Sequence, residues 1–368
     1  FSQQRPLAWG SVVAMPSRGV LCTDFRFPSL CHRSSSKSLK YRFLVSLMRN
    51  AARRAPHSVN MLRMLCDRSV PTALVRKDVG YTPEVVKLPS HDAAEMGIEW
   101  VLPKTRSSSW FDISCLGGLS RSPQVTHPWG PKKPDKVVLY LHGGAYLLCT
   151  PASLRGITFS LAGALKAPLC AVDYRRPPEY PIPAPMDDAI AAYRNLLEIF
   201  PGTDIIVAGD SAGGGIAAAM LCQLRENNLP MPRCCILISP WTDLGVDGLR
   251  HATMENEASD FLPAKLVEYC AVAARGELDH DDWRASPLCV SGSLENLPPI
   301  MVVYGEDELL SGQIEKFCSR WEAQGADIKA LSVKGGVHAP LLFHNVWKPA
   351  ADAFHEVSFF AELHCGQV

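Results

Sequence analysis

The sequence predicts an α/β fold in which helices cover both faces of a mostly parallel central sheet, with a helical cap above it. From Lys136 onward, short apolar runs alternate with helix-length amphipathic stretches. The apolar runs are continuous, which is typical of parallel strands buried on both faces. A polar interval at 242–285 interrupts the alternation. We expect it to cap the carboxyl edge of the sheet, where such folds hold their sites.

Each element follows from its own pattern of apolar residues. We expect strands at 137–141, 169–174, 204–208, 234–239, 299–304 and 328–333. The expected helices are 152–166, 185–200, 212–227, 311–324 and 349–363. Upstream, we expect a helix at 58–70 and two strands, 85–88 and 98–102, joined by a polar turn. The interval 105–135 is rich in Ser, Gly and Pro, which predicts a surface insertion.

The first 55 residues differ in composition from the rest. Residues 1–54 hold ten Lys or Arg, many Ser and one acid, Asp24. We expect a poorly ordered basic leader over 1–55, followed by the α/β domain at 56–368, with 56–80 contributing to the cap. The leader fits an organellar transit segment. The alternative is a disordered leader with Met15 or Met48 as the start, and the protein is then expected in the cytoplasm.

Composition excludes several function classes. Lys plus Arg and Asp plus Glu number 37 each, so no overall field favours nucleic acid or an anionic membrane. The 13 cysteines include no CxxC pair, which favours buried thiols in a reducing compartment and predicts neither a zinc site nor another bound metal. No run of 18 apolar residues is present, so no transmembrane helix is expected.

A nucleophile motif lies between an expected strand and an expected helix. It reads Gly209-Asp210-Ser211-Ala212-Gly213. A turn this tight needs tiny residues on both sides of the serine, and the helix amino terminus favours negative charge forming beside it. The pattern therefore predicts Ser211 as a catalytic nucleophile, against the alternative of a purely structural turn.

A second motif, His142-Gly143-Gly144-Ala145, follows the strand at 137–141. Backbone N–H groups without bulky side chains can closely approach an oxyanion. We therefore expect oxyanion donors among Gly143, Gly144, Ala145 and Ala212. His142 itself is expected to brace the loop.

The acid and the base are expected after the last two strands. Three acids follow the strand at 299–304, and we favour Asp307 over Glu306 and Glu308. His338 follows the last strand in the chain order Ser, acid, His, with His344 as the alternative. A serine hydroxyl becomes nucleophilic only when a base accepts its proton, and that base needs an acid to fix its tautomer. Ser211, His338 and Asp307 form the expected triad.

Several sequence blocks together resemble the hormone-sensitive lipase family of α/β-hydrolases, also called the arylacetamide-deacetylase-like serine esterases. The blocks are HGGAY at 142–146, VDYR at 172–175, PEYP at 178–181, PAPMDDA at 183–189, GDSAGG at 209–214, SPWTDL at 239–244, SPL at 286–288 and LPP at 297–299. The resemblance implies an α/β-hydrolase fold and ester hydrolysis through an acyl-serine intermediate, without a cofactor. It assigns the same triad and oxyanion residues to this chain.

The resemblance also implies structural roles for four acids, Glu179, Asp187, Asp188 and Asp243. The chain departs from the family pattern in having Ala145 for a third glycine, Arg176-Pro177 for an apolar-small pair, and Ser311 for an acid four residues after Asp307.

The main functional hypothesis is a serine carboxylesterase acting on small to medium neutral esters. An amidase or deacetylase would use the same triad, and a non-catalytic small-molecule receptor could share the fold. The presence of His338 argues against the receptor. The sequence leaves the acyl and alcohol groups and the oligomeric state open.

Overall fold

The computed structural model describes residues 38–54, 58–68, 79–82, 88–89, 95–103, 128–129, 132–246 and 248–365. The expected strand at 85–88 lies outside the described residues except for its last position. The expected insertion at 105–135 lies outside them except for 128–129 and 132–135.

The central sheet is mostly parallel, as predicted. Its order is β1-β3-β5-β4-β6-β7-β8-β9, and β2 also pairs with β3. The strands from β4 to β9 run parallel to their neighbours, whereas β3 is antiparallel to β5 and to β1. The strands are β1 Val79–Thr82, β2 Leu88–Pro89, β3 Glu95–Pro103, β4 Val137–Leu141, β5 Leu169–Asp173, β6 Ile205–Asp210, β7 Cys234–Ile238, β8 Ile300–Gly305 and β9 Ile328–Val333.

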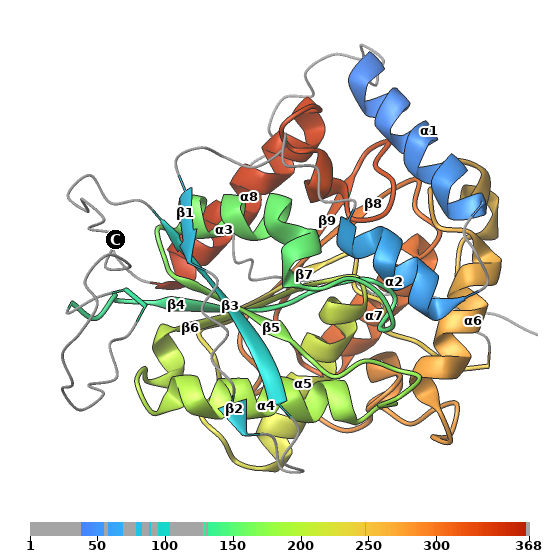
Figure 1. The fold of residues 1–368 in the computed structure, drawn as a ribbon. Coiled ribbons are helices and arrows are strands. Elements are labelled where there is room, and N and C mark those ends of the chain that lie inside the picture. Colours follow the sequence, from blue (N-terminus) through green and yellow to red (C-terminus); the bar gives the residue numbers. More distant parts are fainter. Residues whose placement is uncertain are drawn as a thin grey trace, which may run out of the picture. The chain divides into compact units, whose positions relative to one another are not determined.

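Helices cover both faces of the sheet. Along β4, Val137 and Leu139 pack into one apolar cluster and Val138 and Tyr140 into the other, because alternate strand residues face opposite ways. Figure 1 shows α3 and α8 on one face and α4 and α5 on the other. The helices are α3 Arg155–Leu165, α4 Ala184–Leu197, α5 Ala212–Glu226, α7 Ser311–Ala323 and α8 Lys348–Cys365, with short 3-10 turns η3 Pro151–Leu154, η4 Gly202–Asp204, η6 Pro287–Cys289 and η7 Pro340–Phe343.

Four further elements lie beside the carboxyl ends of the strands. They are α1 Leu39–Arg53, α2 Val59–Arg68, η5 Met254–Ala258 and α6 Ala264–Arg275. Figure 1 shows α1, α2 and α6 on the same side of the sheet. From α2, Arg63 donates to the carbonyl oxygens of Leu147 and Pro177, which follow β4 and β5. We call these four elements the cap; that the intervals 56–80 and 242–285 both contribute to it stays a prediction.

The expectation that residues 1–55 form a poorly ordered leader is wrong for the last third of this segment. Ser38 caps α1, where its Oγ accepts a hydrogen bond from the N–H of Tyr41 (3.1 Å). Tyr41 and Val45 are buried in the same apolar cluster as α3 and α8. The expectation missed this helix because it rested on the basic, Ser-rich composition of the segment. Residues 1–37 lie outside the described part of the chain.

Candidate active site

Ser211 lies in the tight turn between β6 and α5, the strand-turn-helix context that its motif predicted. Its φ of 52° and ψ of −119° lie outside the regions that an L-residue prefers, at a cost of roughly 1–3 kcal/mol. A Cβ atom on Gly213 would lie 2.0 Å from the carbonyl oxygen of Leu141, and one on Gly209 would lie 2.5 Å from that of Gly213. Both flanking residues must therefore be glycine. The turn leaves Ser211 8% exposed at the amino terminus of α5.

Asp210, directly before the serine, ties this turn to the loop after β4. Its Oδ1 accepts hydrogen bonds from the hydroxyl of Tyr140 (2.6 Å) and the N–H of Gly143 (2.8 Å). Burial raises the pKa of the Asp210 carboxyl, and these two hydrogen bonds offset part of that effect.

The contact with Asp210 corrects one expectation, that the N–H of Gly143 serves an oxyanion, because this N–H is already donated. A Cβ atom on Gly143 would lie 2.2 Å from Asp210 Oδ2. Gly143 is therefore needed for close approach to Asp210, and not as a donor to substrate.

The other three expected donors remain available. Gly144 and Ala145 have φ values of 116° and 51°, which turn the loop back after β4. Ala212 is the first residue of α5, where an N–H has no acceptor within its own helix. Within the described ranges, no acceptor is found for the N–H groups of Gly144, Ala145 and Ala212. These three can donate to an incoming oxygen.

His338 is buried in the loop after β9, and its acid partner is Glu308. The distance from His338 Nδ1 to Glu308 Oε1 is 3.3 Å, and both side chains are almost completely buried. This corrects the expectation that Asp307 orients the histidine. Asp307 is partly exposed, and its N–H donates to the carbonyl oxygen of Gly336 (2.8 Å).

A turn at the end of β8 explains why the third acid of the loop faces inward. The N–H of Gly305 donates to Glu308 Oε2 (2.7 Å), which folds this side chain back onto the strand end. Ser239, at the end of β7, donates its hydroxyl to the same oxygen (2.6 Å) and accepts from the N–H of Ala339 (3.0 Å). One serine thus holds both the acid and the residue that follows the histidine.

The electrostatic surroundings favour a protonated His338. Burial alone would lower the pKa of His338. The hydrogen bond and the charge of Glu308, with smaller contributions from Asp260 and Asp210, outweigh burial and raise the pKa above its usual 6.5. An imidazole in this setting is stabilised in the charged form that it takes after accepting a proton.

Sequence reasoning missed Asp260, which follows η5 in the cap. Its carboxylate accepts hydrogen bonds from the N–H groups of Leu309 (2.8 Å), His338 (3.1 Å) and Phe261 (2.7 Å). Burial is the largest cause that raises its pKa, to about 6. Asp260 therefore links the cap to the loops of both Glu308 and His338. The local sequence, Ser259-Asp260-Phe261, carries no motif that would have singled it out.

Comparisons with known proteins bear on the family and the fold of the chain. A family model described as alpha/beta hydrolase fold matches residues 138–342. An acetyl-hydrolase of Streptomyces hygroscopicus is 41% identical over 182 residues, which is 49% of this chain and 60% of that protein. An esterase of Acinetobacter venetianus is 31% identical, covering 61% of this chain and 74% of that one.

Solved structures match nearly the whole chain. A crystal structure of EstE5 soaked by p-nitrophenyl butyrate has a TM-score of 0.71 at 25% identity, covering 88% of this chain and 97% of that one. An esterase from the bacterial hormone-sensitive lipase family has a TM-score of 0.72 at 24% identity, with the same coverage. The chain belongs to the family of proteins with the alpha/beta hydrolase fold.

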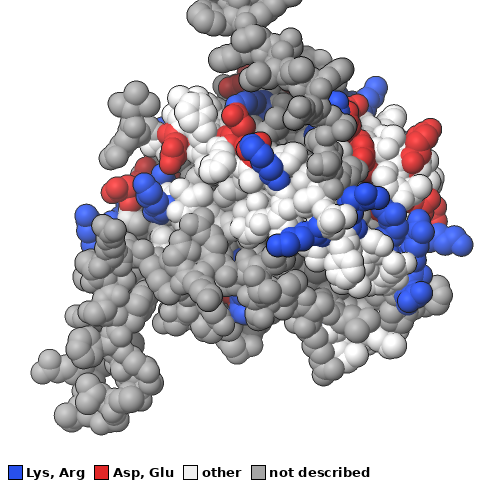
Figure 2. Space-filling view, turned by 90° about the horizontal axis from the view of Figure 1, so that it is seen from above, with Lys and Arg blue, Asp and Glu red and all other residues white. Residues whose placement is uncertain are grey.

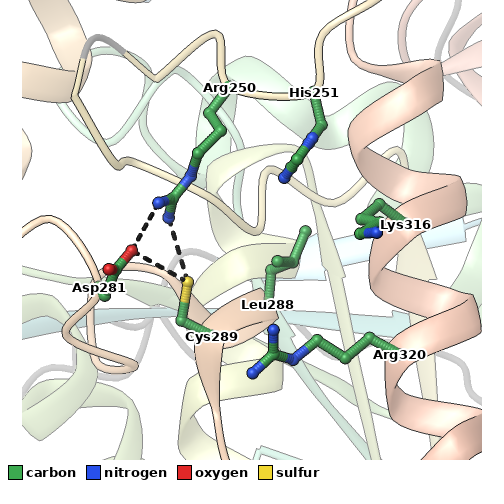
Figure 3. Close-up of a pocket in the computed structure, with 7 residues that line it drawn as sticks. All are labelled: Arg250, His251, Asp281, Leu288, Cys289, Lys316 and Arg320. Atoms are coloured by element: carbon green, nitrogen blue, oxygen red, sulfur yellow. Dashed lines mark hydrogen bonds and ion pairs between the residues drawn. The ribbon is translucent and has the colours of Figure 1, made fainter. Parts of the chain in front are cut away.

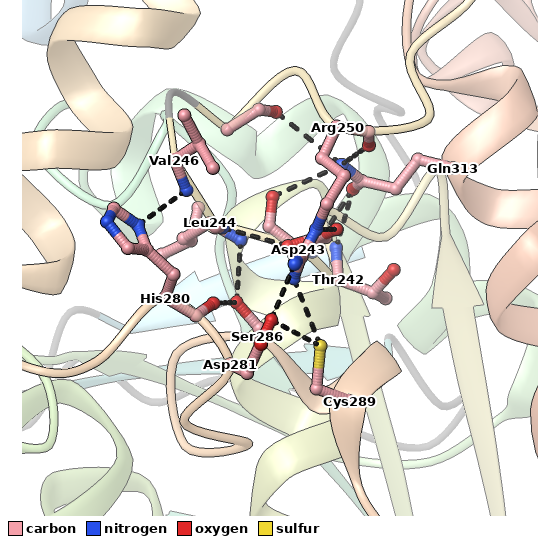
Figure 4. A network of polar contacts seen from close by, with 12 residues as sticks. Thr242, Asp243, Leu244, Val246, Arg250, His280, Asp281, Ser286, Cys289 and Gln313 are labelled. Atoms are coloured by element: carbon pink, nitrogen blue, oxygen red, sulfur yellow. Dashed lines mark hydrogen bonds and ion pairs between the residues drawn. The ribbon is translucent and has the colours of Figure 1, made fainter.

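Three of the four acids that the family resemblance marked as structural hold loops in this hydrolase. Asp188 pairs with Arg175 (3.0 Å), and Glu179 pairs with Arg63 of the cap (2.8 Å). Asp243 is fully buried, pairs with Arg250 (2.7 Å) and accepts from the N–H of Gly245. Figure 4 shows Asp243 and Arg250 in a polar network with Gln313, Asp281 and Cys289. The network joins the end of the SPWTDL segment to α7.

His142 also has a structural position. Its ring stacks on Tyr174, with 4.2 Å between centroids, and its Nδ1 lies 2.7 Å from the carbonyl oxygen of Gly143. Burial lowers the pKa of His142 to about 3, so this imidazole stays neutral at physiological pH. These contacts agree with the expectation that it braces the loop.

A cavity of about 300 Å³ lies apart from these residues. It is lined by Arg250, His251, Asp281, Leu288, Cys289, Lys316 and Arg320 (Figure 3). None of the expected site residues contributes to it, and Arg250 is already held by Asp243. The expected site residues therefore lie at the strand ends around Ser211, outside this cavity.

Two kinds of feature are not found among the described residues. Among those residues, no group of three His, Cys, Asp or Glu side chains is arranged to hold a metal ion. None of the helices described there combines the length and apolar character needed to cross a bilayer.

Proposed function

We propose that the chain is a serine carboxylesterase that hydrolyses small to medium neutral esters. In this proposal Ser211 is the nucleophile, His338 the general base and Glu308, in place of Asp307, the orienting acid. The observation that carries it is the 3.3 Å contact between His338 and the buried Glu308 in a chain whose Ser211 occupies a strained elbow. Relatives named acetyl-hydrolase and ethyl acetate hydrolase support a short acyl group.

The reaction has two halves. The hydroxyl oxygen of Ser211 attacks the ester carbonyl while His338 Nε2 takes its proton, and Glu308 stabilises the imidazolium. The N–H groups of Gly144, Ala145 and Ala212 donate to the oxyanion. The alcohol leaves with the proton from His338, and an acyl-serine remains. Water then attacks this intermediate with His338 again acting as base, which releases the acid and restores Ser211.

Replacing the nucleophile tests this proposal. Ser211→Ala should reduce kcat/KM for p-nitrophenyl butyrate by at least about 10³-fold, because loss of a triad member costs up to about 10⁶ in kcat in a comparable hydrolase. The unfolding midpoint should stay within a few degrees of wild type, since the elbow glycines are unchanged. Unchanged turnover in the Ser211→Ala variant would disprove the mechanism.

Substrate class needs a separate measurement. Matched acetyl, butyryl and longer-chain esters should be compared with the corresponding anilides and with an emulsified triglyceride. We expect the highest kcat/KM on the short and medium esters. An anilide rate above the ester rate would favour the amidase alternative, and binding without turnover would favour the receptor.

A further inference from the structure

The outward face of α1 carries three large apolar side chains. Leu39, Phe43 and Leu47 are 83%, 68% and 56% exposed. Their spacing of four residues places them on one side of the helix. We call Leu39, Phe43 and Leu47 the α1 stripe. Three neighbouring apolar side chains this exposed mark a surface that contacts something other than water.

Basic side chains border the α1 stripe on both sides. At 100° per residue, Lys40 lies beyond Leu47 on one side of the stripe, and Arg42 and Arg53 lie on the other. All three are exposed, and α1 contains no Asp or Glu. Figure 2 shows basic side chains gathered around uncharged ones on the side where α1 lies in Figure 1. The whole chain has no net charge, so this positive charge is local.

The opposite face of α1 fixes how the helix is turned. Tyr41 stacks on Trp347, with 4.2 Å between ring centroids, and Val45 is buried beside it. Arg49 donates to the carbonyl oxygens of Ser259 and Asp260 in the cap. Because these contacts hold the inner face, the α1 stripe cannot rotate inward to bury itself.

The last helix provides an internal contrast. In α8, Phe359 and Leu363 are 59% and 53% exposed and are also four residues apart. Their exposed charged neighbours are acidic, Glu356 and Glu362. The exposed apolar side chains of α8 thus lie beside acids, one of which, Glu356, pairs with Lys329 (3.0 Å). What distinguishes the α1 stripe is the combination of apolar and basic side chains.

We propose that the α1 stripe docks this protein on the surface of an anionic lipid bilayer. The apolar side chains would enter the boundary between headgroups and acyl chains, and the cations would contact the anionic headgroups. The 15-residue helix α1 is about 22 Å long, which is too short to span a bilayer core of about 30 Å. In this proposal α1 therefore lies in the plane of the interface. Tyr41, on the inner face, contacts the loop before His338. Docking therefore places the candidate active site beside the lipid.

Cosedimentation of the full chain with vesicles tests the proposal independently of catalysis. The vesicles are made of ether-linked phosphatidylcholine with or without 30% ether-linked phosphatidylglycerol, because these lipids contain no carboxylic ester. We expect at least about tenfold stronger binding to the anionic vesicles, and weaker binding as salt increases. Phe43→Ser/Leu47→Ser and Lys40→Glu/Arg42→Glu should each weaken binding at least about tenfold.

Phe359→Ser/Leu363→Ser in α8 is the matched control and should bind anionic vesicles as wild type does. All three double variants change exposed residues, and their unfolding midpoints should match wild type. Equal binding to neutral and anionic vesicles, or equal effects of the α1 and α8 changes, would overturn the proposal. A change of oligomeric state in the α1 variants without lipid would overturn it too, because the α1 stripe would then pack against a second copy.

Discussion

The two sides of the candidate active site are built by different means. On the nucleophile side, backbone atoms and glycines fix Ser211, and a Cβ on Gly213 would lie 2.0 Å from a neighbouring carbonyl oxygen. On the histidine side, Glu308 accepts a long-range hydrogen bond from the hydroxyl of Ser239, and the N–H of His338 donates one to Asp260. A steric turn fails completely when its glycine is lost. A hydrogen-bonded assembly can lose its contacts one at a time, so its parts can be tested separately.

Within this comparison of the two sides, the largest expected effect separates the two candidate acids. Glu308→Gln should lower kcat/KM on a short-chain ester by about 10²–10⁴-fold, because an amide cannot stabilise the imidazolium as a carboxylate does. The kcat/KM of Asp307→Asn should stay within about threefold of wild type, since Glu308 is the acid that lies against His338 Nδ1. A larger loss in Asp307→Asn than in Glu308→Gln would restore the acid that the sequence favoured.

The same pair of variants makes a pH prediction. Catalysis needs neutral His338, and Glu308 raises the pKa of this group. Activity in wild type should therefore rise with pH through a midpoint above 6.5. Removing the negative charge of Glu308 should move that midpoint to lower pH in Glu308→Gln, while Asp307→Asn keeps the wild-type profile. Profiles of kcat/KM between pH 5 and 9 measure this, and coinciding midpoints in Glu308→Gln and wild type would contradict the contact.

This contrast also explains what the sequence could and could not predict. The parallel sheet, the elbow and His338 follow from local patterns, because strand period, tight-turn glycines and chain order are encoded in neighbouring residues. Choosing Glu308 over Asp307 depends on how one turn folds onto Ser239, 69 residues away. Asp260 and Tyr41 act through contacts 78 and 296 residues away along the chain. No pattern of neighbouring residues predicts contacts between residues so far apart in the chain. The basic composition around α1 also hid the apolar face that this helix buries.

The next effect tests the nucleophile side. Gly143→Ala should lower kcat by about 10²–10³-fold, comparable to the loss of an oxyanion donor, because the added methyl group must displace Asp210 and the loop of Gly144 and Ala145. Ala145→Gly is the matched control and should stay close to wild type, since its φ of 51° suits glycine. Near-normal turnover in Gly143→Ala would show that the loop can accommodate the added methyl group, contrary to the short distances to Asp210.

Asp260 gives a stability prediction on the histidine side. Burial raises the pKa of its carboxyl from 3.8 to about 6. The folded state thus binds this proton more tightly than the unfolded state, and the resulting stabilisation is complete below about pH 3.8 and lost as pH rises through about 6. A difference of about two pKa units corresponds to about 3 kcal/mol.

Asp260→Asn removes this titration. Its amide also loses acceptor capacity toward three N–H groups, which adds a penalty that does not depend on pH. The free energy of unfolding of the variant, relative to wild type, should therefore rise by about 3 kcal/mol between pH 3.5 and pH 7. Urea denaturation at several pH values measures it. Parallel stability curves for the two proteins would mean that the pKa of Asp260 is the same in the folded and unfolded states.

The smallest expected effect concerns the most distant support of His338. The hydroxyl of Tyr41 donates to the carbonyl oxygen of Gly335 (3.2 Å) and accepts from the N–H of Val337 (3.1 Å). Tyr41→Phe leaves these two backbone groups without that partner and should destabilise the protein by about 1–3 kcal/mol. The ring still packs on Trp347, so kcat/KM should change less than about threefold. Tyr180→Phe, at a half-exposed ring, is the control and should leave the unfolding midpoint unchanged. If both variants unfold at the wild-type midpoint, α1 contributes to this site by apolar packing alone.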